Sequence, residues 1–410
     1  MLSQYRVLDL TDEKGFLCGK ILADLGADVI KVEKPGGDPA RRIGPFYNDI
    51  PDPQRSLYWF AFNANKRGIT LNIETSDGQE IFKKLTKTAD IIVESFPPGY
   101  MGKLGLDYHR LTEINPQIIM TSITPFGQTG PYRDLKASDI TLIAMSGWMY
   151  ICGDPNHPPV RVSFPQAYLN AGAEAAVASL IALYYREITG TGQYVDVSIQ
   201  QSLTLTGFNS TAFWELNGKI LQRAGPFRIG ISSEVKLRQT WPCQDGFISF
   251  TLFGGKTGAR TNRELTQWMA EEGMSSEFID AIDWENWDMA KAQQESINQI
   301  EELLARFFKA HSKEELYHKA VERGIMLCPV STPRDVIENP QLKARGFWTN
   351  LEHPEVGATI PYPGACIRTS EVKCGPRRRA PLIGEHNLEI YGEIGLSREE
   401  IVKLKQAGVI

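Results

Sequence analysis

Short β-type runs and longer helical stretches alternate along the first hundred residues. Apolar runs at 5–10, 28–33 and 90–94 have the length of strands, and the stretches near 15–25 and from Asp77 onward have the character of helices. Strands that alternate with helices are typical of a parallel sheet covered by helices. The pattern therefore predicts an α/β fold for this part of the chain.

The same pattern continues into the middle of the chain. We expect a further strand at 117–123 and an alanine-rich helix from Ala171, because alanine is the residue that most favours helix formation. Gly190 and Gly192 are expected to end this helix, since helices commonly terminate at glycine. Another strand is expected at 194–199.

The character of the sequence changes between residues 225 and 325. Here a strand-like run is followed by charged helical stretches around 260–271 and 296–310, and short β-type runs return from Met326 onward. We therefore expect two domains. The predicted large domain comprises residues 1–224 together with 326–410, and the predicted smaller α+β domain comprises residues 225–325.

Charge and hydropathy exclude some classes of partner. The 44 basic and 49 acidic side chains give a formal net charge of -5 and are interspersed, so no basic stripe indicates nucleic-acid binding. No basic-then-apolar leader precedes the first strand, and no run reaches the roughly 18 continuous apolar residues that span a bilayer. We therefore expect a cytoplasmic protein with no membrane partner, and reduced cysteines, because no C-x-x-C spacing occurs.

The motifs of two common classes of site are absent from the sequence. The turn after the first strand reads TDEKGFLCG rather than G-x-G-x-x-G, so it lacks the close backbone approach to pyrophosphate that dinucleotide binding needs. No H-E-x-x-H occurs, and His311 and His318 are two helical turns apart, too far to chelate one ion from a single helix. We therefore expect neither a bound dinucleotide nor a metal.

Several unusual strings occur in one order along the chain. Together they resemble the family III CoA-transferases, a family that also includes acyl-CoA racemases. The resemblance implies an interlocked-ring dimer, with a Rossmann-like large domain built from both ends of the chain and a smaller domain between them. The strings are ILADLGADVIKVEKPGGDPARR (21–42), NANKRGITLNIE (63–74), ADIIVESFPPG (89–99), TPFGQTGPYRD (124–134), REITGTGQYVDVSI (186–199) and PLIGEHN (381–387).

The resemblance also implies a surface for coenzyme A, which would be a thioester substrate rather than a tightly bound cofactor. Basic side chains are expected near the adenosine and phosphates because coenzyme A is a highly charged anion, and lysine serves as a point charge for phosphate. The residues at the corresponding positions of this sequence are Lys34, Leu71, Phe96, Lys103 and Lys136.

Two parts of this surface depart from the family pattern. The usual glutamine-alanine-glycine-proline turn after the first strand reads Glu13, Lys14, Gly15, Phe16, and the usual E-N-F reads Glu94, Ser95, Phe96. These departures put the affinity of the chain for coenzyme A in question.

The position of the family's catalytic aspartate is occupied by Tyr168. The family motif is proline, any residue, small, Asp, any two, small, glycine, and the chain matches it without gaps from Pro165 to Gly172 apart from the tyrosine. The family mechanism needs a carboxylate whose anhydride a thiolate or a second carboxylate can open. A phenol would give a less labile ester and is mostly protonated near neutral pH. The racemases' histidine position matches Ser138, so racemase chemistry lacks both of its groups.

Two other carboxylates of the chain are candidates for a replacement nucleophile. Glu174 lies six residues after Tyr168, which places it on a different face of a helix. Asp139 corresponds to a position that supports the family's site and would not attack by itself. We therefore expect no catalytic residue in this chain.

The leading hypothesis is a nucleophile-lacking subunit of a heteromeric transferase that moves CoA between succinyl-CoA and a carboxylic acid. A homologous family III subunit would supply the catalytic aspartate. Among heteromeric members, the chain is similar to the aspartate-lacking subunit of the enzymes that activate benzylsuccinate in anaerobic toluene degradation. Two alternatives are a non-enzymatic acyl-CoA-binding or scaffold protein, and an acyl-CoA isomerase or racemase with altered chemistry in which Tyr168 acts as an acid.

Overall fold

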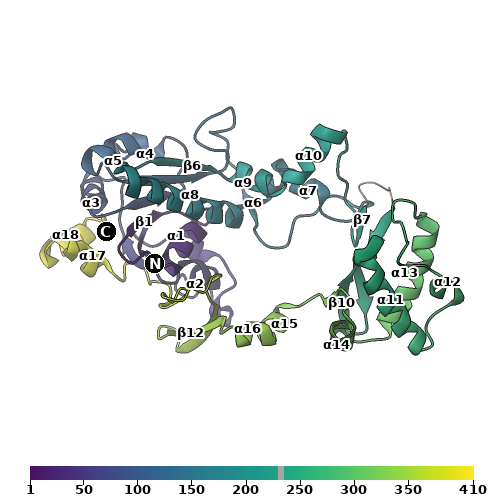
Figure 1. Ribbon diagram of the computed structural model, residues 1–410. Coiled ribbons are helices and arrows are strands. Elements are labelled where there is room, and N and C mark those ends of the chain that lie inside the picture. Colours follow the sequence, from purple (N-terminus) through teal and green to yellow (C-terminus); the bar gives the residue numbers. More distant parts are fainter. Residues whose placement is uncertain (230–234) are drawn as a thin grey trace. The chain divides into compact units, whose positions relative to one another are not determined.

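The computed structural model describes residues 1–229 and 235–410 (Figure 1). Within these residues the chain forms two compact units. The division predicted from the sequence, with a small domain at 225–325, stays a prediction. The first unit contains Met1–Met149, Arg161–Lys219 and Pro340–Ile410, and the second contains Tyr150–Val160 and Ile220–Asn339.

A six-stranded parallel sheet forms the centre of the first unit, so the expected α/β fold is confirmed. Its strand order is β3-β2-β1-β4-β5-β6, the order of the Rossmann fold. Leu8 pairs with Ile30 on one side and with Ile92 on the other, so β1 lies between β2 and β4. The strands stay parallel, and it is the order in which the chain adds them that reverses between β1 and β4. The strands are β1 (Arg6–Leu10), β2 (Asp28–Glu33), β3 (Arg67–Thr70), β4 (Ile91–Glu94), β5 (Ile119–Thr124) and β6 (Tyr194–Ser198).

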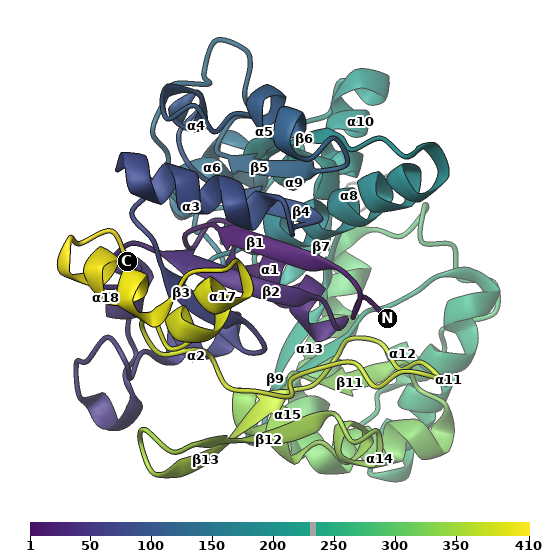
Figure 2. The same ribbon diagram turned by 90° about the vertical axis from the view of Figure 1, so that its left-hand side faces the viewer.

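Helices cover both faces of this sheet (Figure 2). Alternate side chains of each strand point to opposite faces, so Val7 joins one core cluster and Leu8 the other. One face packs against α1 (Phe16–Asp24), α6 (Asp139–Met145), α8 (Ala167–Thr189) and α9 (Ile199–Thr206). The other packs against α3 (Ser76–Thr86), α4 (Tyr100–Lys103), α5 (Tyr108–Ile114), α17 (Asn387–Glu393) and α18 (Arg398–Gln406).

Helix α8 packs closely against α1. A Cβ atom at Gly172 would lie 2.9 Å from the Cβ of Leu17 and 3.3 Å from the backbone nitrogen of Cys18, so only glycine allows this approach. The helix ends at Thr189, and Gly190 follows in the left-handed conformation, as the sequence predicts. The close packing fixes the N-terminus of α8, and with it Tyr168, relative to the first turn of the sheet.

Helix α8 is also long and apolar enough, by length and composition, to cross a membrane. Half of its most apolar window is buried inside the protein, where it packs against the sheet and against α1. A single helix of this kind is weak evidence for a membrane span, because core helices of globular proteins meet the same criterion. The expectation of no membrane partner therefore stays a prediction.

The second unit has its own core around a three-stranded antiparallel sheet. Trp241, Phe250 and Phe308 are buried at its centre, with ring centroids 5.4 and 5.7 Å apart for the two pairs that include Phe308. The sheet contains β9 (Thr240–Cys243), β10 (Gly246–Phe250) and β11 (Leu327–Pro329). A two-stranded ladder of β7 (Phe227–Ile229) and β8 (Lys236–Arg238), and helices α11 (Gly255–Glu271), α12 (Glu277–Asp280), α13 (Gln294–Lys309), α14 (Lys313–Arg323) and α15 (Pro333–Glu338), complete it.

A hairpin near the C-terminus packs on a short helix of the first unit. Leu351 and Tyr362 of the hairpin share a core cluster with Trp59 and Phe60 of that helix. The helix is α2 (Leu57–Asn63), and the hairpin consists of β12 (Trp348–His353) and β13 (Ala358–Pro363). The remaining elements are the 3-10 turns Pro39–Arg42 and Tyr47–Asp49 and helices α7 (Trp148–Ile151), α10 (Phe208–Asn217) and α16 (Pro340–Ala344).

Candidate active site

Most of the residues expected to contact coenzyme A follow the carboxyl ends of strands of the parallel sheet. Lys34 comes directly after β2, Leu71 after β3 and Phe96 shortly after β4, while Lys103 ends α4. Ligands of open α/β sheets bind outside the carboxyl ends of the strands, near the point where the strand order reverses. The structure therefore places these residues at the edge of the sheet where a ligand is expected.

Lys34 and Phe96 are joined by two residues that sequence reasoning missed. The Lys34 ammonium lies 2.8 Å from the Glu74 carboxylate, and the Tyr100 hydroxyl donates to the same carboxylate oxygen at 2.6 Å. The Phe96 and Tyr100 rings stack with centroids 4.7 Å apart. Glu74 and Tyr100 end or directly follow two of the strings that carry the family resemblance, which was the available signal.

The other three predicted contacts differ in how they are placed. Leu71 is only 2% exposed, and its backbone N–H donates to the Glu33 carbonyl, so its side chain belongs to the core rather than to a surface. Lys103 and Lys136 are exposed, on α4 and on the loop before α6. The roles of Leu71, Lys103 and Lys136 in binding coenzyme A all stay predictions.

Tyr168 lies half-buried in the first turn of α8. Burial, and then the negative charges of Glu13, Asp12 and Asp139, raise the pKa of Tyr168 to about 12. The same surroundings, with burial again the largest cause, raise the pKa of Tyr58. Both phenols are therefore protonated near neutral pH, and neither is a competent nucleophile.

Asp139 contacts the N-terminus of α8. Its Oδ1 accepts a hydrogen bond from the Ala167 N–H at 2.8 Å, and its Oδ2 lies 3.9 Å from the Arg161 guanidinium. A carboxylate at this place interacts favourably with the helix dipole. Glu174, by contrast, lines a separate pocket of about 580 Å³ formed with α9, so the tertiary structure brings neither carboxylate forward as a replacement for the aspartate.

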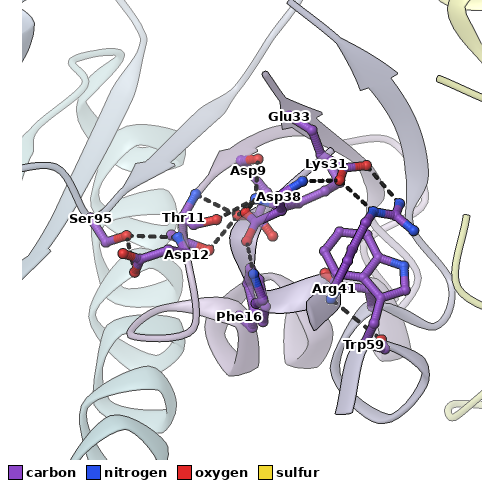
Figure 3. Close-up of polar contacts among 12 residues, drawn as sticks. Asp9, Thr11, Asp12, Phe16, Lys31, Glu33, Asp38, Arg41, Trp59 and Ser95 are labelled. Atoms are coloured by element: carbon purple, nitrogen blue, oxygen red, sulfur yellow. Dashed lines mark hydrogen bonds and ion pairs between the residues drawn. The ribbon is translucent and has the colours of Figure 1, made fainter. Parts of the chain in front are cut away.

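A buried charge cluster supports the turn that follows β1 (Figure 3). The Lys66 ammonium, fully buried, lies 2.7 Å from Asp9 Oδ2 and also donates to the Phe16 carbonyl at 3.1 Å. Lys31 donates to the Thr11 carbonyl and lies 3.9 Å from Asp9 Oδ1. Burial by itself would raise the pKa of Asp9, but Lys66 and Lys31 hold it below its usual value.

A second buried ion pair supports the loop after β2 (Figure 3). The Arg41 guanidinium contacts both carboxylate oxygens of Glu33, at 2.6 and 2.7 Å, and lies 3.7 Å from the centre of the Trp59 ring. Arg41 and the Trp59 indole both donate to the Pro381 carbonyl. This pair ties the C-terminal PLIGEHN segment to the loop that carries Lys34.

The turns after β1 and β4 are bridged where the strand order reverses (Figure 3). The Asp12 N–H donates to Ser95 Oγ at 2.9 Å, and the Ser95 hydroxyl donates back to Asp12 Oδ1 at 2.8 Å. The Lys14 N–H also donates to Asp12 Oδ1, and the Lys14 ammonium pairs with Asp12 Oδ2. We call the reciprocal pair of hydrogen bonds the Asp12–Ser95 clip. Ser95 is one of the positions where the sequence departs from the family pattern, and Asp12 directly precedes the other departure at Glu13 to Phe16.

A buried carboxyl group lies below the turn that carries Ser95. The Glu94 side chain is 4% exposed, accepts from the Phe96 N–H at 2.6 Å, and lines a pocket of about 380 Å³ with Ser122 and Tyr194. The Tyr194 hydroxyl donates to Ser122 Oγ at 2.9 Å. Burial is the largest cause that raises the pKa of Glu94, which reaches about 7. Glu94 is therefore positioned to hold the turn and to titrate near neutral pH.

Glu94 is expected to make the stability of the protein fall as pH rises from about 5 to 8. Its folded pKa lies above the unfolded value, so the folded state binds the extra proton and loses that advantage as the carboxyl ionises. The loss amounts to ~3 kcal/mol at full ionisation. Urea denaturation at a series of pH values measures the slope. Glu94→Gln should flatten this slope, and the exposed control Glu113→Gln should leave it unchanged; equal slopes in wild type and Glu94→Gln would contradict the prediction.

Among residues 1–229 and 235–410, no group of three or more His, Cys, Asp or Glu side chains is arranged to hold a metal ion. The spacing of the histidines in the sequence predicts that the protein binds no metal, and this stays a prediction.

Comparison with known proteins decides the family. The model of CoA-transferase family III matches residues 2–387, nearly the whole chain. The chain belongs to this family. The resemblance found in the sequence strings is thus confirmed.

Relatives within family III match over the full length of the chain. The chain is 38% identical to the succinyl-CoA:(R)-benzylsuccinate CoA-transferase subunit BbsE of Thauera aromatica, over 100% of this chain and 98% of that protein. It is 32% identical to a formyl-CoA:oxalate CoA-transferase of Streptomyces avermitilis, over 100% and 99% of the two chains. Thioesters of coenzyme A are the substrates of family III.

The fold of the family is shared as well. A CaiB/BaiF family protein from Brucella suis superposes with a TM-score of 0.81 at 28% identity, over 95% of this chain and 98% of that one. The Rossmann-like α/β class is confirmed, whereas the interlocked-ring dimer implied by the family stays a prediction.

Proposed function

We propose that this chain is the nucleophile-lacking subunit of a heteromeric family III CoA-transferase. The observation that carries the proposal is Tyr168, which stands at the start of α8 where the family mechanism needs an aspartate carboxylate. A homologous family III subunit would supply that aspartate. The scaffold around the position is intact, including the Asp139 contact to the N-terminus of α8 and the close packing at Gly172.

The environment of Tyr168 supports a non-catalytic role. A phenol whose pKa is raised to about 12 stays protonated, and the nearby charges are negative, so nothing there favours the phenolate. The same facts weigh against an isomerase that uses Tyr168 as a general acid, since an acid works best with a pKa near the operating pH.

An exposed apolar stripe on α8 supports the presence of a partner chain. Val177, Ile181, Tyr184 and Ile188 are between 52% and 71% exposed and recur at intervals of three or four residues, on one face of the helix. Contiguous apolar surface of this kind commonly marks an interaction site. We propose that the homologous subunit covers this stripe, in an interlocked dimer of the family type.

The similarity to BbsE, a subunit of a succinyl-CoA:(R)-benzylsuccinate CoA-transferase, supports a proposal for the donor and the acceptor of CoA. We propose succinyl-CoA as the donor and benzylsuccinate as the acceptor, as in anaerobic toluene degradation, in a complex located in the cytoplasm. We further propose that Lys34, Phe96, Lys103 and Lys136 contact the nucleotide half of coenzyme A. The predicted domain division, with residues 225–325 as the smaller domain, belongs to the same proposal.

Partner dependence tests the proposal. The purified chain alone should show no thioester exchange from succinyl-CoA to benzylsuccinate above background, and the chain together with its homologous partner should show robust exchange, measured by chromatography of the CoA esters. Tyr168→Phe in the complex should change the rate by less than about twofold, because the phenol takes no part in the chemistry. Robust exchange by the lone chain, or a large loss in the Tyr168→Phe complex, would refute the proposal.

A second candidate function is that of an acyl-CoA-binding or scaffold subunit without any part in catalysis. The Asp12–Ser95 clip favours it, because Ser95, which departs from the family pattern, holds an acidic side chain between the two turns. Omission of this chain from the complex separates the two functions: a partner that exchanges CoA at the full rate without it would support the scaffold.

A further inference from the structure

The Asp12–Ser95 clip lies at the place in the sheet where a ligand would enter. β1 and β4 are the strands between which the order reverses, and the turns after them frame the crevice that binds ligands in folds of this type. The clip joins those two turns by two hydrogen bonds of 2.8 and 2.9 Å (Figure 3). A ligand arm that passes between the turns would therefore meet the Asp12 carboxylate.

Asp12 is close to most of the acidic groups of the crevice. Its negative charge is among the causes that raise the pKa of Glu13, Asp38 and Tyr168. Asp12 and Glu13 thus lie near Tyr168, together with Asp139 at the N-terminus of α8, and Asp38 lies near Asp12 and Glu13. This arrangement gives the crevice a negative potential.

The nearby cations are already engaged by protein groups. The Lys14 ammonium pairs with Asp12 itself, Lys31 is buried against the Thr11 carbonyl, and the Lys34 ammonium binds Glu74. Lys14 and Lys31 offset part of the acidic charge, since Lys14 pairs with Asp12 and Lys31 lies 3.7 Å from Asp38, but each ammonium is already held by protein oxygens. An anion that enters the crevice would have to displace one of these contacts and would still face Asp12.

We propose that Asp12 is a specificity-determining residue that excludes the diphosphate and pantetheine arm of coenzyme A from this chain. Ser95 holds the carboxylate between the two turns, and contact between its negative charge and the diphosphate is electrostatically unfavourable. The adenosine end can still contact Lys34, Phe96 and Lys103, which lie outside the clip. The inference rests on the proposed function: the chain lost access for the thioester as well as the nucleophile.

Calorimetric titration of the full-length chain with coenzyme A and with adenosine 3′,5′-bisphosphate tests the inference. The bisphosphate carries the nucleotide end but no diphosphate–pantetheine arm. Wild-type chain should bind coenzyme A no more tightly than the bisphosphate. Asp12→Asn keeps the shape and the acceptor oxygen of the side chain but removes its charge, so it should bind coenzyme A at least about tenfold more tightly. The affinity for the bisphosphate should change by less than about twofold.

Two further variants make the outcome decisive. Glu80→Gln, on the exposed surface of α3, changes the net charge by the same amount and should leave both affinities unchanged. Asp12→Ser removes the charge with a smaller side chain and should reproduce the gain of Asp12→Asn. The inference is overturned if the wild-type chain already binds coenzyme A more than tenfold more tightly than the bisphosphate. It is also overturned if neither Asp12 variant binds coenzyme A more tightly than wild type, or if neither binds it at all. A gain in affinity for coenzyme A in Glu80→Gln as large as that in the Asp12 variants would overturn it as well.

The outcome is independent of the test of partner dependence. A chain that needs its partner for thioester exchange could still bind coenzyme A well in the wild type, which would overturn the exclusion by Asp12 alone. A chain that exchanges CoA unaided would overturn the proposed function, whatever the two Asp12 variants do to binding.

Discussion

Replacement of Lys66 by methionine is expected to lower the free energy of unfolding by about 3–5 kcal/mol. Lys66 and Asp9 are both fully buried, with their charged atoms 2.7 Å apart, and Lys66 also donates to the Phe16 carbonyl and to Asn63. Methionine has a similar volume but leaves the Asp9 carboxylate without its nearest counter-charge in the core. Lys31, 3.9 Å from the other Asp9 oxygen, compensates only in part.

Urea denaturation followed by circular dichroism measures this loss, and Lys84→Met provides the matched control. Lys84 is exposed on α3, so its replacement should change the unfolding free energy by less than about 0.5 kcal/mol. The double variant Asp9→Asn/Lys66→Met should lose less than the sum of the two single variants, because neither charge is then left alone. Equal losses for Lys66→Met and Lys84→Met would show that the buried pair does not support the fold.

Arg41→Lys is expected to lower the free energy of unfolding by about 3 kcal/mol although it keeps the positive charge. Lysine cannot reproduce the two hydrogen bonds that the guanidinium makes with Glu33, nor the flat contact with the Trp59 ring at 3.7 Å. It would also lose the bond from the guanidinium to the Pro381 carbonyl. The C-terminal segment should become more accessible as a result.

The neighbouring Arg42 gives a close control, because it is exposed and follows directly in the sequence. Arg42→Lys should leave the denaturation midpoint within experimental error. Hydrogen exchange at residues 381–387 should rise in Arg41→Lys and not in Arg42→Lys. If Arg41→Lys and Arg42→Lys have the same denaturation midpoint, the bidentate geometry of Arg41 adds no stability beyond that of a single positive charge.

These two charge clusters stabilise the scaffold beneath the candidate site. The buried cluster of Asp9, Lys31 and Lys66 holds the turn that follows β1. The buried pair of Arg41 and Glu33 holds the loop that carries Lys34. Both lie beneath the site and do not depend on the residue at position 168. On the proposed function, a tyrosine at this position would therefore remove the chemistry and leave the surrounding structure in place.

Much of the fold could be predicted from the pattern of the sequence. The apolar runs at 5–10, 28–33 and 90–94 are strands of the parallel sheet, and the alanine-rich stretch that ends at Gly190 is α8. These elements depend on periodicity and on residues next to one another, which a sequence displays directly. The family and the substitution at Tyr168 could be predicted too, because both depend on strings of neighbouring residues.

The contacts of the candidate site could not be predicted in the same way. Asp12 and Ser95 are 83 residues apart, Asp9 and Lys66 are 57 apart, and Arg41 and Pro381 are 340 apart. Each contact exists only because the strand order brings the two segments together, and hydrophobic spacing does not encode that order. At Leu71 the family pattern predicts a contact with coenzyme A, and only the tertiary structure shows that the side chain is buried in the core.

The sequence by itself determined the α/β class and the family, because each follows from local properties of the chain, and the proposal that Tyr168 replaces the aspartate rests on the same strings of neighbouring residues. Tertiary structure alone decided what surrounds Tyr168: the acidic neighbours that keep its phenol protonated, and the Asp12–Ser95 clip across the crevice. The physical reason is that charges act through space, over distances set by packing rather than by position along the chain.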